Sequence, residues 1–131
     1  MKSSLSFLAI GATLIVVVAG GISARAQDAL DPRIAAYDKG PAKIDVSKYP
    51  ADMQAGYKLF ATRCSKCHTI ARAINSEFVL EDEWERYVKR MMRKPGSGIS
   101  ANDGEIIYDF LAFDSKIRKK ALYEKRLKQI K

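Results

Sequence analysis

Two cysteines and a histidine stand together near the middle of the chain, in the stretch Cys64-Ser65-Lys66-Cys67-His68. With two residues between the thiols, one turn of backbone presents both sulfur atoms to the two vinyl groups of a haem, and each thiol adds to one vinyl as a thioether. The histidine after the second cysteine is then held beneath the iron as its proximal ligand. The spacing therefore predicts covalent attachment of c-type haem through Cys64 and Cys67, with His68 bound to the iron.

Three other interpretations of this motif fit less well. A thioredoxin-like dithiol needs a strand that leads into a helix of an α/β fold, and no strand pattern precedes Cys64. A zinc site takes four ligands, usually from two pairs, but the chain has 2 cysteines and 1 histidine. A plain disulfide would close a loop too small to remove much chain entropy, and it leaves His68 without a role.

The single histidine also limits the other side of the iron, because no second imidazole is present in the chain. Methionine is the usual alternative and raises the reduction potential. Met53 lies on a predicted helix before the motif, where packing explains it better. Counted from Trp84 along a helix, Met91 points within about 20° of the same direction and Met92 about 80° away. We therefore expect Met91 as sixth ligand and Met92 as second choice; an open sixth position and a packing role for either methionine remain alternatives.

Apolar residues at helical spacing predict three main helices around this site. The predicted ranges are 50–64, 81–93 and 100–114. Pro50 suits a helix start, and Ser100 with Asp103 resembles a capping box. Because no segment has the pattern of a strand or hairpin, we expect an all-α fold.

The chain opens like a secretory signal. Lys2 gives a positive start, residues 5–18 are uncharged and nearly all apolar, and Ala24-Arg25-Ala26 fits a signal-peptidase site. Cleavage after Ala26 would leave 105 of the 131 residues. The whole uncharged stretch, residues 3–24, is also long enough to cross a bilayer, so an uncleaved membrane anchor is the alternative. Both interpretations predict a periplasmic location for the rest of the chain.

Positive charge is concentrated at the end of the chain. Residues 115–131 carry eight basic side chains against Glu124 alone. Tyr123, Leu127 and Ile130 stand there at helical spacing and predict an additional amphipathic helix. Nucleic acid does not fit an exported protein, whereas an acidic face of a protein or an anionic membrane surface does. A solvated helix without a partner is the plain alternative.

The order of helix, haem motif, methionine segment and closing helix resembles a class I, cytochrome c-type domain of the small bacterial type. In that family a glycine and an aromatic residue lie eight and four residues before the first cysteine, as Gly56 and Phe60 do here. The resemblance implies that both pack against the last helix. The matching residues of that helix are Ile107, Phe110 and Leu111.

The stretch 84–100 also resembles the methionine segment of small bacterial members, with Met91 in the ligand position. One departure is that the methionine follows His68 at a shorter spacing than in mitochondrial-type members. The resemblance covers about 50–114. The expected division of the chain is a signal peptide (1–26), an extended lead-in (27–49), a cytochrome c domain (50–114) and a basic amphipathic tail (115–131).

A carrier of one haem c with histidine and methionine on the iron has no open position for a substrate. We therefore expect one-electron transfer between redox partners rather than catalysis. Two alternatives remain: a haem enzyme or gas sensor with an open sixth position, and a haem subunit of a larger oxidoreductase. Residues 51–114 number only 64, and a chain of that size is marginally stable alone. We therefore expect the protein without haem to be largely unfolded.

Overall fold

The computed structural model describes residues 30–130, and the predicted signal segment 1–26 lies outside them. Its helices are α1 (Pro32–Asp38), α2 (Ala51–Cys64), α3 (Ala71–Ile74), α4 (Glu81–Met92), α5 (Ala101–Arg118) and α6 (Lys120–Gln129). No residue between 30 and 130 lies in a strand, which confirms the predicted all-α fold. Over the same range no helix is both long and apolar enough to pass through a bilayer.

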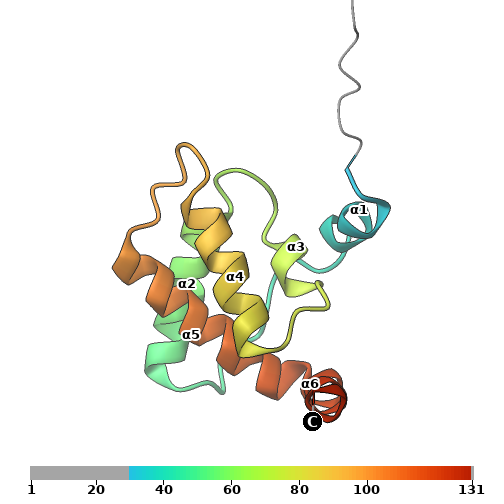
Figure 1. The fold of residues 1–131 in the computed structure, drawn as a ribbon. Helices are drawn as coiled ribbons and strands as arrows, with labels where there is room; N and C mark the ends of the chain where they lie inside the picture. The colour runs from blue at the N-terminus through green and yellow to red at the C-terminus, as the bar shows by residue number, and fades with distance from the viewer. Residues whose placement is uncertain (1–29, 131) are drawn as a thin grey trace, which may run out of the picture.

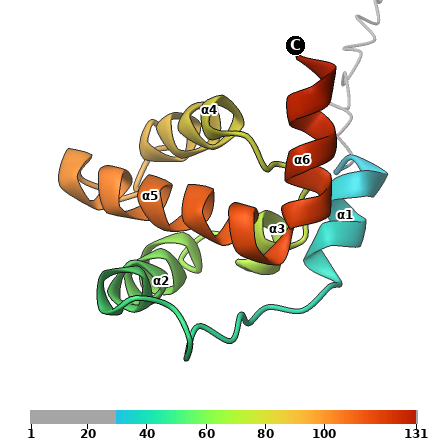
Figure 2. The same ribbon diagram turned by 90° about the horizontal axis from the view of Figure 1, so that it is seen from below.

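The three main helices form the body of the molecule, with α5 packed between α2 and α4 (Figures 1 and 2). Each begins within a residue of its predicted start. At α5 the Ser100 hydroxyl accepts a hydrogen bond from the Asp103 amide at 3.1 Å, so the predicted capping box is present. The core consists largely of side chains from these helices: Phe60, Trp84, Ile107, Phe110 and Leu111 are all buried.

Gly56 lies where α2 and α5 pack closely together. A β-carbon placed on it would lie 3.0 Å from the Cβ of Phe110 and 3.5 Å from the carbonyl oxygen of Ile106. The Phe60 and Phe110 rings meet one turn further along, with their centroids 5.7 Å apart. This confirms the predicted packing of the glycine and the aromatic residue against the closing helix, since only glycine lets two helix backbones approach so closely.

The predicted extended lead-in, 27–49, contains a short helix instead. The Asp31 side chain accepts a hydrogen bond from the Arg33 amide, and Pro32 occupies the first position of α1, both of which favour a helix start. α1 lies beside α3 in both views (Figures 1 and 2). Arg72 of α3 binds Asp38 through two hydrogen bonds. This long-range ion pair stabilises a seven-residue helix that no periodic pattern of apolar residues predicts.

The predicted boundary between residues 114 and 115 falls inside α5, which continues to Arg118. Ser115 is wholly buried and accepts a hydrogen bond from the Trp84 indole at 2.8 Å. Asp114 is also buried, and both of its oxygens accept hydrogen bonds from the Arg118 guanidinium. The first turn of the predicted tail is therefore part of the core, and the additional helix is the shorter α6.

Candidate haem site

The cysteine motif sits where α2 ends. Cys64 is the last residue of α2, and a turn carries Cys67 and then His68 away from the helix. Cys64 is half-buried and Cys67 is exposed, and both are free thiols. The turn brings these three side chains to the wall of one cavity.

This cavity has a volume of about 660 Å³, within the range of cofactor and ligand pockets. One side is the end of α2 with the cysteine motif, and the opposite side is the face of α4 that carries Tyr87 and Met91. Phe78 and Ile99 add apolar surface from the loops on either side of α4. The arrangement offers a wide apolar space with two thiols and one imidazole on its wall.

The orientation of His68 is set by a backbone carbonyl. Its Nδ1 lies 3.0 Å from the carbonyl oxygen of Thr69. Because a carbonyl only accepts hydrogen bonds, Nδ1 carries the proton and the lone pair lies on Nε2. A hydrogen bond of this kind fixes the tautomer of a histidine that ligates a metal. His68 is thus held in the form that an iron ligand needs.

The two adjacent methionines of α4 lie in different places. Met91 lines the cavity together with His68. Met92 instead packs against Gly104 of α5, where a β-carbon on the glycine would lie 2.5 Å from the Met92 sulfur. Met92 also lines a smaller groove between α4 and α5. The structure therefore brings Met91, and not Met92, to the cavity of His68; its role as sixth ligand remains a prediction.

Two buried donors along the cavity have no partner. They are the Nε of Arg63 and the hydroxyl of Tyr87, the only buried side-chain nitrogen and oxygen atoms between residues 30 and 130 without a hydrogen bond. Both residues line the cavity. A buried donor without an acceptor costs roughly 1–3 kcal/mol, so the acceptors belong to whatever fills the space. Haem fits, since it has a large apolar ring and two propionate carboxylates that accept hydrogen bonds.

The surroundings of the cavity are poorly hydrated. Burial raises the pKa of the Cys64 thiol to about 11, and the neighbouring Cys67 adds to the shift. Burial likewise raises the pKa of the Tyr87 hydroxyl to about 12. Both shifts reflect the cost of placing a charge where water is scarce, as is expected around an apolar cofactor.

Many wall residues were not expected from the sequence, among them four that contribute apolar surface or an unpaired donor. Ile34 and Tyr37 come from α1, which had no recognisable pattern. Tyr87 stood in the predicted apolar face of the second helix, with no sign that its hydroxyl would lack a partner. Arg63 directly precedes the first cysteine. This position was the only feature of the sequence that could have indicated a place for Arg63 at the site.

Residues 29–114 match the family model described as photosystem P840 reaction-centre cytochrome c-551. The chain belongs to this cytochrome c-551 family. The match begins before α1, so it includes most of the lead-in that the sequence pattern left outside the resemblance. It ends within α5, four residues before the end of that helix.

A curated protein of Chlorobaculum tepidum named cytochrome c is 39% identical to the chain over 75 residues. This match covers 53% of the chain but only 36% of that relative's own length. No solved structure matches the chain. Together these relationships confirm the predicted small c-type cytochrome, whose family chemistry is electron transfer by covalently bound haem c.

Proposed function

We propose that this cytochrome c-551 family member carries one haem c on Cys64 and Cys67, with His68 and Met91 as the two axial ligands. We further propose that it passes single electrons between redox partners in the periplasm. The observation that carries the proposal is the single cavity whose wall holds both thiols, the oriented imidazole and one of the two α4 methionines.

Each of these side chains has a distinct role. Cys64 and Cys67 tether the cofactor, and His68, oriented by the Thr69 carbonyl, offers Nε2 to the iron. α4 holds Met91 on the cavity side. When bound by these residues, haem would supply the one-electron redox chemistry. The apolar wall keeps water away and so adjusts the reduction potential.

The partner is proposed from the family description, which names a reaction centre. We infer that this chain exchanges electrons with a larger oxidoreductase complex, either as its haem subunit or as a carrier that docks on it. The periplasmic location rests on the sequence of residues 1–26, which has the pattern of a signal or an anchor.

An absorption spectrum tests the proposal. The chain is co-expressed with a haem-attachment system, purified, and measured oxidised and reduced, with mass spectrometry of the intact chain. We expect the mass of one haem, low-spin bands on reduction, and the weak red band of thioether-ligated ferric haem. A high-spin spectrum that changes with carbon monoxide would favour a haem enzyme or gas sensor. A chain without covalent haem would contradict the proposal altogether.

A further inference from the structure

We propose that an acidic partner protein docks on four cations around the opening of the haem cavity, and not on the basic tail. These four residues, here called the mouth cluster, are Lys66, Arg90, Arg93 and Lys94. The inference rests on the proposed electron-transfer function, because it concerns the partner of the same site. It departs from the charge distribution of the sequence, where the excess of positive charge lies after residue 114.

The tail cations are largely engaged within the protein. Lys116 lies 2.7 Å from a Glu81 oxygen, and Arg126 lies 3.6 Å from Glu83. The Lys119 ammonium donates to the backbone carbonyls of Ser76 and Phe78. The remaining pairs are Arg118 with Asp114, Lys120 with Glu124, and Arg126 with Glu77. The tail therefore binds the start of α4 and the loop before it. Much of the positive charge of the tail is neutralised by these contacts.

The mouth cluster is different, because no described carboxylate lies within ion-pair distance of any of its members. All four side chains are exposed. Three cations on the cavity wall or next to the cluster in the sequence are, by contrast, already paired. These pairs are Arg63 with Asp103, Arg72 with Asp38, and Lys89 with Glu85. The four positive charges are thus available to a partner.

Three members of the cluster lie at or beside the cavity, and Arg93 directly precedes Lys94 in the sequence. Arg90 and Lys94 line it, and Lys66 lies between the two cysteines in the sequence. A β-carbon on Gly98 would lie 3.6 Å from the Lys66 ammonium, so Lys66 reaches the loop after α4. Cys67 is exposed and also lines the cavity. A partner attracted by the cluster therefore meets the protein where the cavity reaches the surface.

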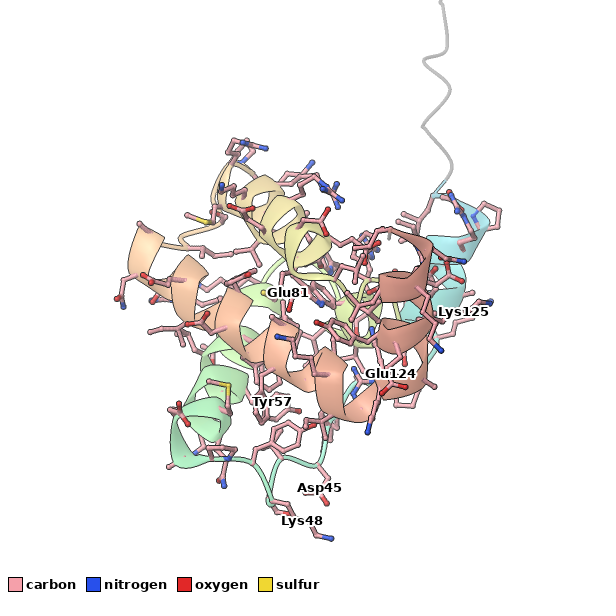
Figure 3. All side chains as sticks on the ribbon, turned by 60° about the horizontal axis from the view of Figure 1, so that its bottom comes forward. Asp45, Lys48, Tyr57, Glu81, Glu124 and Lys125 are labelled. Atoms are coloured by element: carbon pink, nitrogen blue, oxygen red, sulfur yellow. The ribbon has the colours of Figure 1, made fainter. Side chains whose placement is uncertain are left out.

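Distance separates the cluster from the tail. α4 has 12 residues, so its two ends are about 18 Å apart. α6 contacts Glu81 and Glu83 at the start of α4. Three of the cluster residues lie near the opposite end of α4. Figures 1 and 2 show α6 away from that end, and Figure 3 labels Lys125 and Glu124 on α6. Charges are screened over about 10 Å at 0.1 M salt, so the charges of α6 contribute little at the cluster.

Two matched double variants test the proposal in the haem-loaded protein. Lys66→Gln with Arg93→Gln removes two cluster charges, and Lys125→Gln with Lys128→Gln removes two exposed tail charges that have no ion pair among the described residues. The probe is hexacyanoferrate(III), which accepts one electron from the reduced protein and becomes hexacyanoferrate(II). At about 0.1 M salt, where charges on α6 are screened from the cluster, we expect the cluster variant to react about tenfold more slowly than wild type, and the tail variant to react within about twofold of it. The difference should vanish at high salt. Equal slowing of both variants, or a slower tail variant, would overturn the proposal.

Nuclear magnetic resonance of the reduced wild-type protein locates the contact directly. Poly-L-glutamate represents an acidic protein, and vesicles that contain phosphatidylglycerol represent an anionic membrane. We expect poly-L-glutamate to shift amide signals around Lys66 and residues 93–98. Shifts confined to residues 120–129, or a response to the vesicles alone, would contradict docking of an acidic protein at the cluster. The proposed function fails separately, if the wild-type protein lacks covalent haem or cannot be reduced reversibly.

Discussion

The indole N–H of Trp84 donates a hydrogen bond to the Ser115 hydroxyl at 2.8 Å, and both side chains are fully buried. The bond joins α4 to the last part of α5. It fixes the start of α4 against α5, and it extends the folded unit beyond residue 114. A truncation after that residue would remove the acceptor and leave the indole without a partner.

Ser115→Ala is expected to lower the free energy of unfolding by about 1–3 kcal/mol, because the buried Trp84 donor loses its acceptor. Urea unfolding of the haem-loaded protein, followed by circular dichroism, measures the change. Ser47→Ala is the control, since Ser47 is exposed and a surface substitution of this kind stays within about 0.5 kcal/mol. Equal stability of the two variants would show that the hydrogen bond contributes nothing.

Gly56→Ala is expected to destabilise the protein by about 1–3 kcal/mol, because the new methyl group meets the Phe110 Cβ and the helix backbone, neither of which moves easily. Gly104→Ala is the matched comparison. Its neighbour is the flexible side chain of Met92, and alanine gains about 1 kcal/mol over glycine in a helix. Thermal unfolding should therefore give Gly104→Ala a clearly higher midpoint temperature than Gly56→Ala. The reverse order of midpoints would contradict the close packing at Gly56.

Replacement of the two α4 methionines separates a ligand from a packing residue. Met91→Ala should convert the low-spin spectrum to a high-spin one and lower the reduction potential, since Met91 lines the cavity. Met92→Ala should keep the low-spin spectrum and lose about 2–5 kcal/mol of stability, because Met92 fills the space beside Gly104. The opposite spectra would assign the ligand to Met92.

The Tyr49 hydroxyl donates to buried Asp114 at 3.0 Å. Burial and the Asp114 charge raise its pKa from 10.0 to about 12. Between these values the folded protein holds a proton that the unfolded chain has lost, so stability falls as pH rises. The stabilisation by Tyr49 is fully present below pH 10 and is lost as pH rises through about 12.

The stability difference between wild type and Tyr49→Phe should therefore be constant from pH 7 to 9 and shrink above pH 10. Urea unfolding at each pH measures it. Absorbance titration provides a check, since the variant should lack one tyrosine that ionises near pH 12. If the tyrosine that is missing in the variant ionises near pH 10 instead, the hydrogen bond to Asp114 does not stabilise the protonated form of Tyr49.

The local chemistry could be predicted because it depends on residues close together in the sequence. The spacing of Cys64, Cys67 and His68 indicates haem attachment without any knowledge of the fold. Helical phase predicted that Met91 and Met92 point in different directions, and Met91 lines the cavity. Gly56 indicated a close approach of two backbones before the second backbone was identified.

The properties that depend on distant residues could not be predicted in this way. α1 is stabilised by the pair of Asp38 with Arg72, which lie far apart in the sequence. The unpaired donors of Arg63 and Tyr87 become visible only when the cavity between α2 and α4 is formed. The total charge of the tail is a property of composition, but its pairing with Glu81 and Glu83 is not.

The sequence by itself predicted the covalent chemistry at the motif and determined the all-α class and the three main helices, because each depends on contacts within a few residues of the chain. Only the tertiary structure decided that Ser115 belongs to the core and that Lys66 and Lys94, near the cavity, have no ion pair among the described residues. The physical reason is that burial and ion pairing depend on separations in space, and folding brings together groups that are distant along the chain.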